Sequence, residues 1–255
     1  MNWFNFFSKG PLKPKQIDKA VALIENRFAQ TDVRLREMAK LLEEGTPEAW
    51  RAVLKRFAMT ANGQIADEQE KQWLEDELVH LGVNVSIELE HYVRTETHIT
   101  YPLRAFERIN GVPAGLELSV SALEGHGPSC HRSIDAKLEL VWHIAENLVD
   151  SFDISRLIAF LEDFSDDVRW AVMDIVDALR RKDTAFSTEF ISGLGESLGR
   201  MVTEEEASTR IASRAAELLH AFEYANANLS EAKPRADLDP AFFFDKKGYL
   251  RRRKA

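Results

Sequence analysis

The chain has 255 residues and a formal net charge of −9, with 45% hydrophobic and 29% charged residues. These proportions are ordinary for a folded protein, and the apolar runs are far shorter than the roughly 18 residues that a membrane-spanning helix needs. A single cysteine, Cys130, excludes an internal disulfide framework, and no signal peptide is evident, so the sequence predicts a cytoplasmic protein.

Basic residues gather at the two ends of the chain. Residues 1–15 and 246–255 contain no acid, so all 42 acidic residues lie between them. A strongly acidic body repels nucleic-acid phosphates, and we therefore expect no nucleic-acid partner. A basic protein segment is the partner that this charge favours.

Residues 1–14 form an aromatic and basic N-terminal segment. Aromatic residues followed by lysines are able to rest on an anionic membrane, and equally able to pack on the first helices of the same chain. Intramolecular packing or simple disorder is the favoured interpretation, and membrane contact through residues 1–15 or docking into a partner is the alternative. The residues concerned are Trp3, Phe4, Phe6, Phe7, Lys9, Lys13 and Lys15.

Residues 15–226 show helical periodicity, and residues 32–57 predict two consecutive helices joined by a tight turn. Apolar residues recur at helical spacing on both sides of a glycine, which a threonine–proline pair follows as at a typical helix start. The residues concerned are Val33, Met38, Leu41 and Leu42 before the turn, Gly45, Thr46 and Pro47 in it, and Ala49, Val53, Leu54 and Phe57 after it.

Three further helices are expected in the first half. Asp67 and Glu70 have the spacing of a capping box, which predicts the start of the first of these helices. Residues 83–89 alternate with period two, as a strand does, but the helices on either side favour a helix there as well. The expected limits are Gly82 for the first helix, and Pro102 and Asn110–Gly111 for the third.

Three amphipathic helices are also predicted in the second half. Each has an apolar stripe that should face the core. Acidic or hydroxyl residues should cap the starts of the second and third helices. The stripes are Leu138, Val141, Trp142, Ala145 and Leu148; Val168, Ala171, Val172, Ile175 and Leu179; and Ile211, Ala215, Leu218 and Leu219. The expected caps are Asp166 or Asp167 for the second helix, and Thr203 with Glu206 for the third.

The triplet Asp-Val-Arg opens two of these helices, at residues 32–34 and 167–169. We expect about six antiparallel helix pairs at a period of roughly 33–40 residues, which is typical of helical repeats. With these openings the chain resembles the HEAT-repeat family over roughly residues 15–225. The resemblance implies an all-α fold, a right-handed superhelix of helix pairs, in which Asp32, Arg34, Asp167 and Arg169 form a structural ladder between repeats.

The predicted function is that of a monomeric, non-enzymatic scaffold or adaptor. In HEAT stacks the second helix of each pair lines the concave face, so an acidic concave surface is expected to bind a basic protein or peptide. Trp170 would be its aromatic anchor. Packing of Trp170 on a neighbouring repeat is the alternative interpretation. The expected partner-binding residues are Trp170, Asp174, Asp177 and Arg181.

An enzyme with a HEAT-like fold, metal-dependent or lyase-like, is the alternative function. The loop Gly125–Ser133 contains His126, Cys130 and His131, which together could supply three zinc ligands. Adjacent residues rarely orient a thiolate–imidazole pair, and consecutive helices do not easily bring four metal ligands together. We therefore predict no catalytic residue, metal or cofactor. We also expect no metal at the three Glu-x-x-His pairs of the sequence, which are Glu77/His80, Glu88/His91 and Glu217/His220.

Residues 227–241 form a predicted linker, and residues 242–255 a basic C-terminal tail. Two apolar runs in the tail flank Asp245–Gly248, a sequence that suits a tight turn with a glycine in the left-handed conformation. The sequence therefore predicts a small β-hairpin. An isolated hairpin is marginal in water, so it should dock on the last helices or bind a partner.

Overall fold

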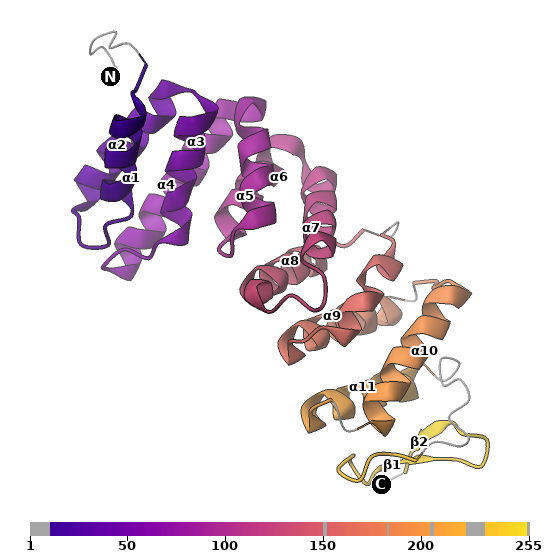
Figure 1. Cartoon of the computed structure of the whole chain (residues 1–255). Helices are drawn as coiled ribbons and strands as arrows, with labels where there is room; N and C mark the ends of the chain where they lie inside the picture. The colour runs from indigo at the N-terminus through magenta and orange to yellow at the C-terminus, as the bar shows by residue number, and fades with distance from the viewer. Residues whose placement is uncertain (1–10, 150–151, 183, 205–206, 223–232, 254–255) are drawn as a thin grey trace. The chain divides into compact units, whose positions relative to one another are not determined.

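The structure, a computed structural model, describes residues 11–149, 152–182, 184–204, 207–222 and 233–253, without the side chain of Arg132. These residues are mostly helical and end in one two-stranded sheet (Figure 1), so the predicted all-α class with a C-terminal hairpin is confirmed. The chain divides into two compact units, residues 1–118 and 119–255. Within the described residues, no helix is both long and apolar enough to cross a bilayer.

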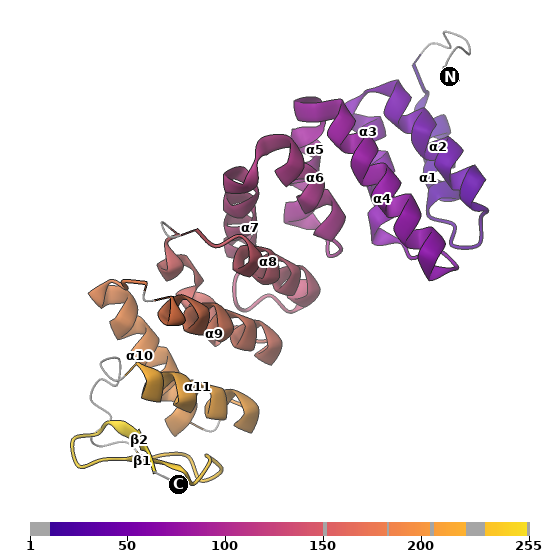
Figure 2. The same cartoon turned by 180° about the vertical axis from the view of Figure 1, so that it is seen from behind.

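Unit 1 is built from helices in two layers. Helices α1, α3 and α5 pack on one another in order, and α2, α4 and α6 form the second layer (Figure 2). The helices are α1 Pro14–Ile24, α2 Thr31–Glu44, α3 Pro47–Leu54, α4 Gln64–Leu81, α5 Ser86–Thr95 and α6 Thr100–Asn110. Two 3₁₀ helices, η1 Lys55–Ala58 and η2 Gly82–Val85, extend α3 and α4.

The junction between α2 and α3 has the predicted chemistry. Gly45 ends α2 with a φ of +68°, a conformation that glycine adopts without steric cost. The hydroxyl of Thr46 accepts a hydrogen bond from the backbone N–H of Ala49 at 3.3 Å, and Pro47 begins α3. The prediction that residues 83–89 are helical is also confirmed, since η2 runs directly into α5.

The predicted capping box of Asp67 and Glu70 is wrong. Helix α4 begins at Gln64, so both residues lie inside it, and both side chains are buried. The carboxylate of Asp67 accepts a hydrogen bond from the backbone N–H of Ala61 at 2.7 Å, which joins α4 to the preceding loop. The two acids thus have partners outside their own helix.

Unit 2 continues the chain from α7, which begins in unit 1. Helix α9 packs on α8, η4 and α11, while α10 packs on η4 and α11. The elements are α7 Val112–His126, η3 His131–Ser133, α8 Ile134–Glu146, η4 Ile154–Glu162, α9 Asp166–Arg181, α10 Thr188–Thr203 and α11 Thr209–Ala221.

The starts of α9 and α11 differ from the predicted caps. Ser165 occupies the N-cap position of α9, and Asp166 and Asp167 lie in its first turn, where negative charge favours the helix dipole. Thr203 ends α10 and does not begin α11, so its predicted capping role is wrong; Glu206 lies outside the described residues. Helix α11 is capped by the hydroxyl of Ser208.

The C-terminal hairpin consists of β1 Phe242–Phe244 and β2 Leu250–Arg252 in antiparallel register. Gly248 has a φ of +79° in the turn, as predicted, and the carboxylate of Asp245 accepts hydrogen bonds from two turn N–H groups. Strand β2 packs on α11. Of the predicted linker, residues 227–232 lie outside the described part; further on, Arg235 is buried against the end of α10.

Candidate functional site

The predicted anchor Trp170 lies between α9 and α11. Its ring sits beneath the guanidinium groups of Arg210 and Arg214, whose carbons are 4.6 and 5.7 Å from the ring centroid. Such contacts are cation–π interactions, and here they join neighbouring helices. The ring therefore packs on a neighbouring helix, as the alternative interpretation of Trp170, packing on a neighbouring repeat, would require.

The acids near Trp170 bind arginines of the same unit. Asp177 is buried and accepts hydrogen bonds from Arg180, Arg181 and Arg214 at 3.0, 2.6 and 3.1 Å. Burial alone would raise the pKa of Asp177, but the hydrogen bonds from Arg180 and Arg214 lower it below its ordinary value. Asp174 also accepts from Arg214, at 2.7 Å. The charge expected to attract a partner is therefore largely neutralised at this place.

A different tryptophan is open to solvent. Trp142 on α8 is 55% exposed, although its place in the apolar stripe predicted burial. Helix α8 buries another face, made by Ala136, Lys137, Leu140, Val141 and Ile144. The predicted stripe is therefore wrong for Trp142 and for the exposed Ala145.

Trp142 forms one wall of a shallow apolar groove between α8 and α9. The groove has a volume of about 280 Å³ and is mostly lined by aliphatic carbon. Exposed tryptophan beside a concave apolar surface is the usual form of an anchoring site for a partner side chain. The lining residues are Trp142, Ala145, Leu148, Ala171, Asp174, Ile175 and Ala178.

Acidic residues surround the exposed indole. Asp135, Glu139 and Glu146 are spaced from Trp142 so that all four share one face of α8. Asp135 and Glu146 are exposed, and Asp174 lies on the opposite wall of the groove. The acids of α8 thus give the apolar centre a rim of negative charge, whereas the charge of Asp174 is already paired with Arg214. The periodicity of α8 contained this signal, because one helical stripe carries three acids and a tryptophan.

The predicted ladder residues do not have equivalent surroundings. Arg34 is buried and binds Glu70 of α4, whereas Asp32 on the same helix is exposed. Asp167 accepts a hydrogen bond from Arg210 of α11 at 2.9 Å, which joins α9 to α11 within unit 2. Arg169 binds the backbone carbonyl of Asp163, in the loop before its own helix.

The residues of the loop after α7 are not brought together as metal ligands. His126 ends α7, and burial and the charge of Lys137 lower its pKa. The ring of His131 is exposed and contacts Phe164 edge-on at 3.9 Å between centroids. Throughout the described ranges, no three His, Cys, Asp or Glu side chains form a group suited to a metal ion.

The Glu-x-x-His pairs make contacts of other kinds. Glu88 forms an ion pair with Arg51, and so links α5 to α3. Glu217 pairs with Arg214 within α11 at 3.2 Å, while the ring of His220 faces Phe242 of the hairpin. These contacts hold helices and the hairpin together.

Comparisons of the chain with protein-family models, with curated proteins and with solved structures find no match.

Proposed function

We propose that this chain is a HEAT-like helical-repeat protein that binds a basic segment of a partner protein, non-enzymatically, in the groove between α8 and α9. The observation that supports the proposal is Trp142, an exposed indole at an apolar groove with Asp135, Glu139 and Glu146 on the same helix face. The paired packing of helices within each unit is compatible with the repeat class.

The groove suits one apolar side chain of a partner. A volume of about 280 Å³ accommodates a single large side chain, and Ile175 and Leu148 supply aliphatic contacts beside the indole. Burial of such an anchor in a site that excludes water commonly dominates the affinity of an interface. Lysine or arginine residues on either side of the anchor would then meet the acids of α8.

The acidic rim contributes more to encounter and selection than to the final affinity. Opposite charges accelerate association and discriminate against acidic partners, and salt screens both effects. Binding should therefore weaken with rising ionic strength, while its dependence on Trp142 should persist.

The anchor in this proposal is Trp142, in place of Trp170, which the sequence predicted. Trp170 is covered by Arg210 and Arg214, so a partner would first have to displace two guanidinium groups. Trp142 needs no such displacement, because it is exposed to solvent in the described structure.

Selection from a displayed library of random peptides on the immobilised full chain tests the proposal. The expected sequences carry one large apolar residue with lysine or arginine on both sides. Trp142→Ala should abolish the binding of a selected peptide, and Glu139→Gln with Glu146→Gln should weaken it. Phe28→Ala, which removes another exposed aromatic residue, should leave it unchanged. Selection of acidic peptides, or binding that survives Trp142→Ala, would overturn the proposal.

A further inference from the structure

The two Asp-Val-Arg triplets place their arginines at the same position of their helices. Arg34 is the fourth residue of α2 and Arg169 is the fourth residue of α9. Each guanidinium reaches back to a carbonyl of the preceding loop: Arg34 to Asn26 at 3.2 Å and Arg169 to Asp163. The two arginines are therefore local structural equivalents.

Their surroundings on the packed neighbouring helix, α4 for Arg34 and α11 for Arg169, differ. Arg34 donates two hydrogen bonds to the buried carboxylate of Glu70 on α4, at 2.8 and 2.7 Å. In unit 2 the corresponding neighbour is α11, whose single acid, Glu217, binds Arg214. Among the described residues, the acid paired with Arg169 is Asp166 of its own helix, at 3.8 Å. Within the described ranges, Arg169 thus has no bidentate carboxylate of the kind that its equivalent has.

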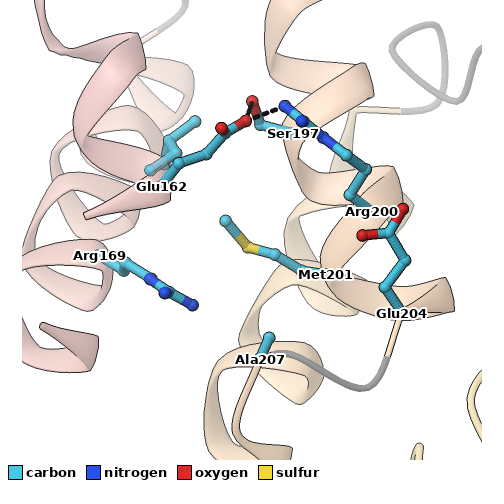
Figure 3. A pocket seen from close by; sticks show the side chains of 8 residues that line it. Glu162, Arg169, Ser197, Arg200, Met201, Glu204 and Ala207 are labelled. Atoms are coloured by element: carbon cyan, nitrogen blue, oxygen red, sulfur yellow. Dashed lines mark hydrogen bonds and ion pairs between the residues drawn. The ribbon is translucent and has the colours of Figure 1, made fainter. Parts of the chain in front are cut away.

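A cavity lies beside the guanidinium of Arg169. Figure 3 shows the guanidinium of Arg169 directed into a space that residues of η4 and α10 and the connection after α10 also line. The volume of this cavity is about 200 Å³, and Leu161, Met201 and Ala207 provide apolar lining. The side chain of Arg169 is only 18% exposed, so a charge bound there would be poorly hydrated.

Among the described residues that line the cavity, Arg169 is the cation without a close carboxylate partner, since its ion pair with Asp166 is long, at 3.8 Å. Arg200 pairs with the carboxylate of Glu162, which also accepts a hydrogen bond from the hydroxyl of Ser197 at 3.0 Å (Figure 3). These three side chains therefore satisfy one another. Glu204 is exposed at the rim, on the side away from Arg169.

We propose that this cavity binds a small organic carboxylate, which takes at Arg169 the place that Glu70 has at Arg34. Arginine in partly buried surroundings binds a carboxylate through two parallel N–H···O bonds, one of the stronger polar contacts in proteins. The short aliphatic part of the ligand would contact Leu161 and Met201. An α-amino acid would in addition direct its ammonium group towards Glu204.

The size of the cavity sets the size of the ligand. Sites for drug-sized molecules have volumes of roughly 300–1,000 Å³, so a cavity of about 200 Å³ fits an acid of only a few carbon atoms. A wider depression of about 640 Å³ shares Arg169, Ser197 and Arg200 with the cavity, and offers a route of entry. This site is independent of the groove at Trp142.

Ligand-observed NMR on the full chain tests the proposal with three probes: butyrate, L-leucine and the uncharged amide butyramide. Butyrate, leucine or both should show saturable binding, and butyramide should show none. Stronger binding of leucine would assign its ammonium group to Glu204, whereas binding of butyrate alone would define a site for simple acids.

Variants of the cavity make the test specific. Arg169→Lys should weaken binding by at least about tenfold, because a lysine cannot make the bidentate contact. Ala207→Leu fills the cavity without changing Arg169 and should abolish binding, whereas Arg251→Lys, on the hairpin, should have no effect. Glu205→Gln with Glu206→Gln, at positions outside the described residues, should leave binding intact or strengthen it.

The proposal would be overturned if neither acid showed saturable binding or if butyramide bound equally well. Binding that Arg169→Lys and Ala207→Leu both leave unchanged would also overturn it. Binding that first appears when Glu205 and Glu206 are replaced would also overturn it, since the carboxylate at Arg169 would then belong to the chain itself.

Discussion

Arg34 of α2 and Glu70 of α4 form a bidentate ion pair in the interior of unit 1, with N–O distances of 2.8 and 2.7 Å. Arg56 donates a third hydrogen bond to the same carboxylate at 3.1 Å, and all three side chains are excluded from water. Because the charges are buried, each depends on the others to offset the cost of leaving water. This cluster fixes α2 and the α3–η1 segment against α4.

Replacing Glu70 with glutamine should therefore destabilise unit 1 strongly. The change leaves the buried guanidinium of Arg34 without its carboxylate, while Arg56 keeps its ion pair with Asp67 at 2.7 Å. Loss of one partner from a buried pair typically costs about 3–5 kcal/mol. Urea denaturation followed by circular dichroism measures the change. Glu90→Gln is the control, because the exposed Glu90–Arg94 pair should contribute less than about 1 kcal/mol. Equal losses in the two variants would contradict the assigned role of Glu70.

The same cluster makes stability depend on pH in acid. Burial would raise the pKa of Glu70, but the hydrogen bond from Arg34 and the charge of Arg56 lower it below its ordinary value of 4.5. A carboxyl whose pKa is lower in the folded than in the unfolded state stabilises the fold above the unfolded pKa. That contribution to stability disappears as the pH falls through the pKa of the carboxyl in the folded state.

We therefore expect the urea midpoint of the wild type to fall as the pH drops from the pKa that Glu70 has in the unfolded chain towards its lower pKa in the folded protein. Asp67 should act in the same direction, since hydrogen bonds from Ala61 and Lys71 outweigh the effect of burial on its pKa. Glu70→Gln should show a shallower decline over that interval. A variant with the same slope as the wild type would show that Glu70 does not titrate with folding.

The sequence was sufficient to predict many of the helices but not this cluster. Asp67 and Glu70 have the i, i+3 spacing of a capping box, and nothing local distinguishes that role from pairing with an arginine 36 residues away. The boundary at Gly45 was predictable because its cause, a left-handed glycine followed by Thr46 and Pro47, is local. Contacts between helices decide roles that spacing leaves open.

The error at Trp142 has the same origin. Periodicity assigned the buried stripe of α8 to apolar residues and excluded Lys137. In the structure Lys137 is fully buried and binds Asp163 at 2.6 Å, so the buried face is rotated and Trp142 points to solvent. A sequence pattern treats a lysine as polar unless its buried partner is known. The candidate groove follows from that one contact.

Lys137→Met should consequently destabilise unit 2 by about 3–5 kcal/mol, because it leaves Asp163 charged and buried. Adding Asp163→Asn should restore part of the loss, since the uncompensated charge is then removed. A double-mutant cycle in urea measures the coupling between the two sites. Additive losses in the double variant would show that the two side chains do not stabilise each other.

Trp142→Ala should have little effect on folding, in contrast to its expected effect on binding. An indole that is 55% exposed contributes little to the core, so we expect a change within about 1 kcal/mol. Leu140→Ala on the buried face of α8 is the matched comparison, with an expected loss of about 2–5 kcal/mol. Thermal denaturation of both variants gives the measurement. A large loss for Trp142→Ala would mean that the side chain belongs to the core and is not a free anchor.

The C-terminal hairpin depends on the backbone of Gly248. Its φ of +79° is costly for residues with a Cβ, so Gly248→Val should open the turn and weaken the pairing of β1 with β2. Leu250 is fully buried, and strand β2 packs on α11, so loss of the turn should also release the strand from that helix. Hydrogen exchange at Arg253, whose N–H binds the carbonyl of Ala241 at 2.8 Å, should accelerate. Lys246→Ala in the exposed part of the same turn is the control. Equal protection of the Arg253 N–H from exchange in both variants would show that the contact with α11, and not the turn, holds the hairpin.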